Sequence, residues 1–169
     1  MEPISFLPLT SDDFPMLHER LKRPHVAEWW DSPNSFEEVR DHFTAHAMAE
    51  STTRGYIALL SGVPVGFFQS YVVLGSGDGW WEDETDPGAR GIDQFLANAD
   101  QLGTGLGTRL ICAFTDYLFE DAAVTRVQVD PSPLNARAIR SYEKAGFVRS
   151  REVDTPDGRA LLMLRERPR

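Results

Sequence analysis

The order of hairpins and helical crossovers along the 169 residues constrains the fold more than any other sequence feature. Strand-like runs on either side of Ser61-Gly62, and again on either side of Pro156-Asp157-Gly158, are typical of antiparallel hairpins. The other strand-like runs are separated by helix-like segments, and a helical crossover is the usual link between parallel strands. We therefore predict a single α/β domain over residues 1–169, with a central mixed, mostly antiparallel sheet flanked by helices.

Periodicity, capping residues and turn residues place the individual elements. Strands are expected at residues 4–9, 56–60, 65–74, 91–96, 125–130, 147–153 and 160–165. Helices are expected from Ser11 or Asp12 through Leu21, from the Ser35 and Glu38 capping box to about Ala49, over residues 106–119, and over residues 135–145 before Gly146. The stretch between Gly75 and Arg90 is too polar and too rich in glycine for regular structure, so a loop is expected there.

The acidic charge of the chain is concentrated in one stretch. The formal net charge is -9, which argues against a nucleic-acid partner or an anionic membrane surface, because both require a cationic face. Seven acidic side chains and a single base, Arg90, lie between Asp78 and Asp100, whereas ten of the 17 Lys and Arg residues lie from Arg126 onward. Separate anionic and cationic regions suit a protein that handles two oppositely charged ligands.

Several other function classes are disfavoured by what the chain lacks. A single cysteine, Cys112, excludes a disulfide framework and a thiolate zinc site. No signal-peptide pattern and no run of about 18 apolar residues is present, so we expect a cytoplasmic protein without membrane spans. His42 and His46 have the spacing of zinc ligands on a helix, but Phe43 replaces the glutamate of the protease motif. We therefore expect no metal.

A glycine-rich turn opens the most apolar helix. Its residues are Gln101, Leu102, Gly103, Thr104, Gly105, Leu106, Gly107 and Thr108. Three glycines expose backbone N–H groups at a helix start, where the helix dipole also favours a phosphate. The G-x-G-x-G spacing departs from the dinucleotide fingerprint, and the Lys-Ser/Thr ending of a nucleotide-triphosphate loop is absent. Taken alone, a glycine turn that merely starts a helix is an equal alternative.

A second motif follows the glycine turn at a distance of about thirty residues. It runs from Asn135 to Phe147, and together the two segments resemble the acyl-CoA site of the GNAT family of N-acetyltransferases. The positions that match the family motifs are Gln101, Gly103, Gly105, Asn135, Ala138, Ile139, Tyr142, Lys144, Gly146 and Phe147. The resemblance implies a GNAT acyl-CoA N-acyltransferase fold and acetyl-CoA as co-substrate. It also implies that residues 101–108 bind the pyrophosphate and that Asn135 and Ala138 contact the pantetheine arm.

The acidic stretch carries a narrower resemblance. Residues 75–82, 84–88, 90–94, 96–98, 129–133 and 155–158 resemble the aminoglycoside 6′-N-acetyltransferases. The likeness covers nearly the whole chain and is weakest over residues 31–38, where this chain is shorter. It implies transfer of an acetyl group to the 6′-amine of kanamycin, tobramycin or amikacin, and a monomer or weak homodimer.

The resemblance also implies a role for each site residue. Asp93 takes the proton of the attacking amine and contacts the acceptor, and Tyr142 protonates the departing CoA thiolate. Asp78 and Asp130 pair with ammonium and hydroxyl groups of the antibiotic. Three tryptophans, Trp30, Trp80 and Trp81, stack on sugar rings or lie over a cation. Transfer is direct, because Cys112 has apolar neighbours and is not a poised nucleophile.

The residues alone leave alternatives open. Without the family resemblance, a strand-end carboxylate bound to backbone N–H groups is the favoured interpretation of Asp93, and a cap of the following turn is an alternative for Asp130. Asp83 and Glu84 are expected to form a solvated loop face. A core position is an alternative for Trp30 and is the expectation for Trp29. Ring packing in an amphipathic helix is the alternative for Tyr142, but its position in the family motif favours the functional role.

Further alternatives concern the cofactor contacts and the function itself. Arg137 and Arg140 are additional candidates for contact with the CoA phosphates. The rival functions are a GNAT enzyme that acetylates a polyamine or a protein N-terminus, and a non-catalytic protein that sequesters aminoglycosides.

Overall fold

The chain forms a seven-stranded sheet in a computed structural model that describes residues 2–30, 35–47 and 51–169, without the side chains of 45–47. The strands are β1 (Ile4–Pro8), β2 (Arg54–Leu60), β3 (Val63–Val72), β4 (Ala89–Leu96), β5 (Arg126–Val129), β6 (Val148–Thr155) and β7 (Gly158–Glu166). Their order in the sheet is β1-β2-β3-β4-β5-β7-β6. Strands β4 and β5 pair in parallel, and the β1–β2, β2–β3, β5–β7 and β6–β7 pairs are antiparallel. The predicted mixed sheet is confirmed.

The helices agree with the sequence except near the N-terminus. They are α1 (Phe14–Leu21), α2 (Pro24–Ala27), α3 (Phe36–Ala47), α4 (Leu106–Phe119) and α5 (Ala136–Lys144), with 3-10 turns at Ser11–Asp13 and Ala99–Gln101. The helix expected from Ser11 or Asp12 begins as the 3-10 turn that Thr10 caps and continues directly into α1 at Phe14. Helix α2 was not predicted. The end of the helix expected to reach Ala49 lies outside the described residues. None of the described helices is long and apolar enough to cross a membrane.

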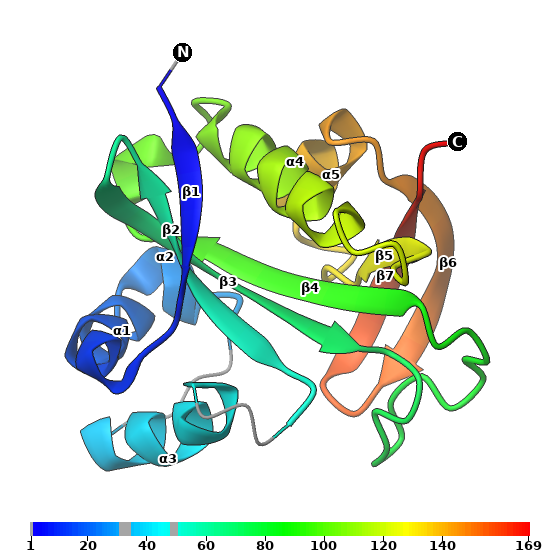
Figure 1. The fold of residues 1–169 in the computed structure, drawn as a ribbon, viewed down its shortest axis with the longest axis horizontal. Coiled ribbons are helices and arrows are strands. Elements are labelled where there is room, and N and C mark those ends of the chain that lie inside the picture. The colour runs from blue at the N-terminus through cyan, green and yellow to red at the C-terminus, as the bar shows by residue number, and fades with distance from the viewer. Residues whose placement is uncertain (1, 31–34, 48–50) are drawn as a thin grey trace. The chain divides into compact units, whose positions relative to one another are not determined.

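Two compact units make up the chain, Met1–Ser70 with Asp93–Leu102 and Tyr71–Ile92 with Gly103–Arg169. In the first unit, α1 packs on α3 and α3 packs on β2 (Figure 1). Its core includes Phe14, Leu17, Leu21, Val39, Phe43, Ile57, Phe67 and Phe95. Residue 66 of β3 is a glycine, and a Cβ at this position would stand only 2.7 Å from the carbonyl oxygen of Phe95. The close contact between the two strands therefore excludes a side chain here. The prediction of one domain over residues 1–169 stays a prediction.

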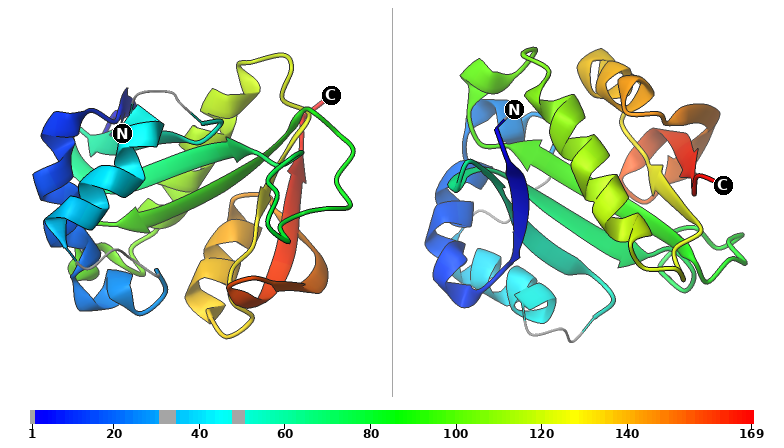
Figure 2. Two further views of the ribbon diagram at one scale, coloured as in Figure 1. Left: turned by 90° about the horizontal axis from the view of Figure 1, so that it is seen from below. Right: turned by 45° about the horizontal axis from the view of Figure 1, so that its top comes forward.

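The second unit contains α4, β5 and α5, which follow the glycine turn in this order. Helices α4 and α5 pack against each other (Figure 2), and α4 buries Leu110, Ile111 and Phe114. Strand β5 is buried over Val127–Val129, and β7 pairs with it on one side and with β6 on the other. Gly146 ends α5 with a φ of 93°, as the sequence predicts for a C-cap glycine.

Candidate active site

Asp93 lies on β4 directly after the buried Ile92 and is itself half-buried. The amide Nε2 of Gln69, on the neighbouring strand β3, donates a hydrogen bond of 3.0 Å to its Oδ2. Gln69 and Asp93 belong to the same unit. A neutral amide donor orients a carboxylate without cancelling its charge.

Trp30 belongs to the first unit's core rather than to an open surface. Its ring meets Phe95 edge-on with centroids 5.3 Å apart, and Phe67 at 6.0 Å. The backbone N–H of Trp30 bonds to the carbonyl of the buried Val26, which places the tryptophan one helical turn after it. Trp29 is 45% exposed, so the expectation of a core role for Trp29 is wrong. Stacking of Trp30 on a ligand stays a prediction.

The glycine turn (residues 101–108) leads into α4 through left-handed backbone. Gly103 has a φ of 72°, and Gly105, the residue that caps α4, has a φ of 88°. A Cβ at either position would meet no heavy atom within 4 Å. Glycine is therefore required here for backbone conformation and not for local space. The first N–H groups of α4 have no partner inside the helix, so they can bind an anion.

Asn135 and Tyr142 are set by the caps of α5. Asn135 is the N-cap, and its Oδ1 accepts a hydrogen bond of 3.2 Å from the backbone N–H of Ala138. Tyr142 is buried, with its ring packed edge-on against Phe147 at 5.6 Å. Packing of the Tyr142 ring, considered as an alternative, is thus present, and it does not exclude a role for the hydroxyl group. Arg137 and Arg140 are both exposed.

The acidic loop (residues 73–88) connects β3 to β4 and carries two strained residues. Asp78 has a φ of 54° and Trp81 a φ of 50°, although neither is glycine. A left-handed residue of this kind costs about 1–2 kcal/mol, and a bulky side chain makes it rarer still. The backbone N–H of Trp80 donates a hydrogen bond to the carbonyl of Gly77, and the ring centroids of Trp80 and Trp81 lie 6.0 Å apart. Strain of this kind clusters at functional sites.

An open cavity of about 420 Å³ lies beside the acidic loop. Its lining includes Trp80 and Trp81 from the loop, residues 151–155 of β6, and Arg159. Arg151 pairs with Asp83 at 2.8 Å, which ties the loop to β6. Arg151 and Arg159 were not predicted, because charges on an outer strand are indistinguishable in sequence from a solvated face.

The prediction of a solvated loop face is wrong for Glu84. The Glu84 side chain is only 9% exposed and is paired with Arg126 of β5. Its Oε1 also accepts the backbone N–H groups of Thr85 and Asp86. Asp83, by contrast, is 68% exposed, as expected. No local pattern distinguishes Glu84 from its exposed neighbour Asp83, because the arginine that pairs with Glu84 lies 42 residues further along the chain.

Asp130 and Cys112 complete the predicted set. Asp130 is half-buried directly after β5, at the start of the Pro131 turn. Cys112 is partly buried on α4, and this burial raises the pKa of its thiol. A raised pKa disfavours the thiolate and hence an acyl-enzyme.

The described residues contain no cluster of three or more side chains suited to a metal ion, and the His46 side chain is outside them.

A mixed sheet, a glycine turn that starts α4 and a capped α5 define the class of acyl-CoA N-acyltransferases. Residues 10–155 match the family model described as acetyltransferase (GNAT) domain. The chain therefore belongs to the GNAT family.

Several similar proteins carry names that refer to aminoglycosides. Aminoglycoside N(6′)-acetyltransferase type 1 of Klebsiella pneumoniae is 53% identical over 162 residues, which cover 94% of this chain and 81% of that enzyme. A kanamycin resistance protein of Rhizobium radiobacter is 64% identical over 88 residues, or 52% of this chain and 82% of that protein. The crystal structure of aminoglycoside acetyltransferase AAC(6′)-Ib with coenzyme A and kanamycin has a TM-score of 0.93 at 53% identity, covering 98% of this chain and 95% of that one.

Proposed function

We propose that this protein transfers the acetyl group of acetyl-CoA to the 6′-amine of aminoglycosides of the kanamycin, tobramycin and amikacin type, and so confers resistance to them. The observation that carries the proposal is the 53% identity, over 94% of the chain, to an aminoglycoside N(6′)-acetyltransferase. The charge distribution supports it, since a polycationic acceptor requires an anionic surface and the acidic loop supplies one.

Asp93 is the proposed base. An aminoglycoside amine is protonated at neutral pH and must lose a proton before it attacks, and Asp93 takes that proton directly or through a water. A carboxylate with an ordinary pKa near about 4 is a weak base, so most of its effect is electrostatic positioning. Partial desolvation of the bound ammonium lowers the amine's own pKa and makes the transfer feasible. The hydrogen bond from Gln69 keeps the carboxylate oriented.

The acetyl group passes directly between the two substrates. The neutral 6′-nitrogen attacks the acetyl carbonyl carbon, an N–C bond forms, and the C–S bond to CoA breaks. Tyr142 donates its hydroxyl proton to the departing thiolate. The attacking nitrogen loses its second proton to solvent as the amide forms, and Tyr142 is reprotonated from solvent. Asp78 and Asp130 pair with the remaining ammonium and hydroxyl groups, and Trp30, Trp80 and Trp81 contact the sugar rings.

The cofactor is bound mainly by backbone. N–H groups of residues 101–108 receive the pyrophosphate at the start of α4, where the helix dipole adds to the attraction. Asn135 and Ala138 contact the pantetheine arm. Because Asn135 Oδ1 already caps α5, that contact falls to its Nδ2.

A free-thiol assay with acetyl-CoA tests the function. Kanamycin, tobramycin and amikacin should each release CoA, and an aminoglycoside with a hydroxyl in place of the 6′-amine should release none. Release with spermidine but not with kanamycin would instead favour a polyamine acetyltransferase. Binding of kanamycin without thiol release from any acceptor would favour sequestration.

A further inference from the structure

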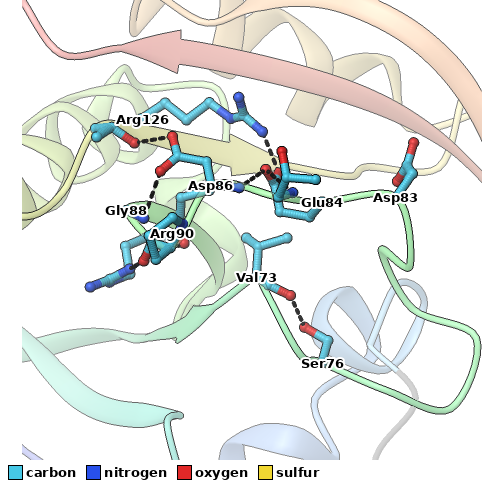
Figure 3. Close-up of polar contacts among 12 residues, drawn as sticks. Val73, Ser76, Asp83, Glu84, Asp86, Gly88, Arg90 and Arg126 are labelled. Carbon is cyan, nitrogen blue, oxygen red and sulfur yellow. Dashed lines mark hydrogen bonds and ion pairs between the residues drawn. The ribbon is translucent and has the colours of Figure 1, made fainter.

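The end of the acidic loop is fixed to β5 by the side chain of Glu84 (Figure 3). Its Oε1 accepts the N–H groups of Thr85 at 3.0 Å and Asp86 at 2.9 Å, while its Oε2 pairs with Arg126. One nearly buried carboxylate therefore closes a local turn and joins the loop to a strand 42 residues further along the chain.

Asp86 makes a second attachment beside the first. Its Oδ1 accepts the N–H of Gly88 at 2.8 Å, and its Oδ2 accepts the hydroxyl of Thr125 at 2.5 Å. The N–H of Thr125 returns a hydrogen bond of 2.9 Å to the carbonyl of Gly88. A Cβ at Gly88 would lie 2.5 Å from the carbonyl oxygen of Ala123, so the two segments are in tight contact. The Thr125 hydroxyl and the Gly88 N–H hold the pKa of Asp86 below its ordinary value.

These attachments lie next to the strained part of the loop. The N–H of Glu84 donates to the carbonyl of Trp81 at 3.1 Å, so the attached residue also closes the turn that contains the left-handed tryptophan. Left-handed residues with side chains persist only where the surroundings over-determine them. Nearer the start of the loop, Ser76 bonds to Val73 through both its N–H and its hydroxyl.

We propose that Glu84 and Asp86 are positioning residues, which hold the acidic loop against Arg126 and Thr125 in the left-handed conformation that presents Asp78 and Trp81 to the acceptor. The identity of that acceptor rests on the proposed function. Asp130 directly follows β5, which begins at Arg126, so the pair between Glu84 and Arg126 also joins the loop to the strand that leads to this proposed acceptor-binding carboxylate.

Two substitutions remove the attachments with little change of shape. Thr125→Val removes the hydroxyl that Asp86 accepts, and Thr125→Ser is the conservative variant that keeps it. Glu84→Gln keeps a side-chain acceptor but removes the charge that faces Arg126. Asp116, on α4, forms an exposed ion pair with Arg165 of β7. Asp116→Asn breaks this pair and serves as the control for loss of an ion pair elsewhere.

Thr125→Val and Glu84→Gln should each raise the KM for kanamycin about tenfold, which is the usual weight of one hydrogen bond to a charged group. The kcat and the KM for acetyl-CoA should stay within about twofold, as should every parameter of Thr125→Ser and Asp116→Asn. Hydrogen exchange at the amides of Trp80 and Glu84 should accelerate by a similar factor in the two disrupting variants, whereas the β5–β7 amides should be unaffected.

An unchanged kanamycin KM together with unchanged exchange at Trp80 and Glu84 would overturn the proposal. A parallel loss of kcat, both KM values and β5–β7 protection would overturn it as well, because that pattern marks a general loss of stability. If the unmodified protein acetylates no aminoglycoside, the proposed function fails, and the exchange comparison still decides whether these residues hold the loop.

Discussion

The two glycine-rich segments of this protein, the glycine turn and the acidic loop, are held in their conformations by different kinds of contact. In the glycine turn, Gly103 and Gly105 are surrounded by open space, and the turn is defined by backbone angles and the helix that follows. The acidic loop also contains left-handed glycines, yet it ends at a crowded glycine, Gly88, and is fixed by Glu84 and Asp86.

The difference matches the charges of the two proposed ligands. Backbone N–H groups bind an anion well, so a pyrophosphate needs only a turn that points them outward. A polycation needs carboxylates, which repel one another when they are gathered in one loop. The loop that carries them must therefore be held by contacts beyond its own backbone, and those contacts are the ion pairs and hydrogen bonds to β5 and β6.

The largest effect should come from removing the proposed base on the acceptor side. Asp93→Asn keeps the size of the side chain and an acceptor for Gln69, but it cannot take a proton at neutral pH. The kcat for kanamycin should fall by about 10²–10⁴, which is the usual weight of general base catalysis. Acetyl-CoA binding, followed by titration calorimetry, should be nearly unchanged.

Gln69→Met is the control for Asp93→Asn, since it removes the orienting amide but keeps the carboxylate. Its loss of kcat should be much smaller. Retention of most of the activity by Asp93→Asn would remove Asp93 from the role of base.

The next effect concerns the departing thiolate. Tyr142→Phe removes the proposed acid and keeps the ring that packs on Phe147. Turnover should slow by about 10–100-fold, with little change in the kanamycin KM or in thermal stability. Steady-state kinetics and a melting curve measure both, and an unaltered kcat would exclude the acid role.

A smaller effect should appear in the glycine turn and only toward the cofactor. Gly105→Ala forces a side chain into a φ of 88°, at a cost of about 1–2 kcal/mol, so the turn relaxes and the KM for acetyl-CoA should rise about tenfold. The kanamycin KM should stay the same. Gly62→Ala is a matched control, because Gly62 has a φ of 79° and equally open space. It should lose similar stability without any change in either KM, whereas an equal rise in both KM values for Gly105→Ala would contradict the division between the two segments.

Local signals in the sequence were sufficient for much of the fold. The glycine cap and the apolar period predicted α4 with the bounds that the structure has, residues 106–119, and a turn at Pro156-Asp157-Gly158 correctly joined β6 to β7. Helix α2 was missed because its four residues are too few to show a period. Trp29 was predicted in the core, yet it is exposed and Trp30 packs against the core instead. Which of two neighbouring residues is buried depends on the path of the chain, and the sequence does not show that path.

The contacts that organise the candidate site are long-range, and that is why the sequence did not reveal them. Glu84 was assigned to solvent because its partner Arg126 is distant in the chain. The ion pair between the exposed Asp83 and Arg151 was not predicted for the same reason. Family motifs singled out Asp93, but nothing in the sequence indicated that Gln69 would orient it. Motifs identify reacting groups, whereas the side chains that hold them depend on which strands become neighbours.

The smallest expected effect is a difference in acid sensitivity between the two segments. The Thr125 hydroxyl and the Gly88 N–H lower the pKa of Asp86 in the folded protein below its usual 3.8. The stabilisation is therefore complete above the unfolded-state pKa and is lost as the pH falls through the lower, folded-state pKa. In Thr125→Val the first of these causes is absent, so the pKa of Asp86 returns toward its usual value. The loss on acidification should then begin at the same unfolded-state pKa but be smaller, and it should end at a higher pH. Hydrogen exchange at Glu84, followed from pH 6 downward and corrected for the intrinsic rate, measures the size of this loss, and α4 amides after the glycine turn serve as the internal reference. Equal losses in the two proteins would mean that Asp86 acts by shape alone; a smaller loss in Thr125→Val, confined to the acidic loop, would identify its attachment as electrostatic, in contrast to the backbone-defined glycine turn.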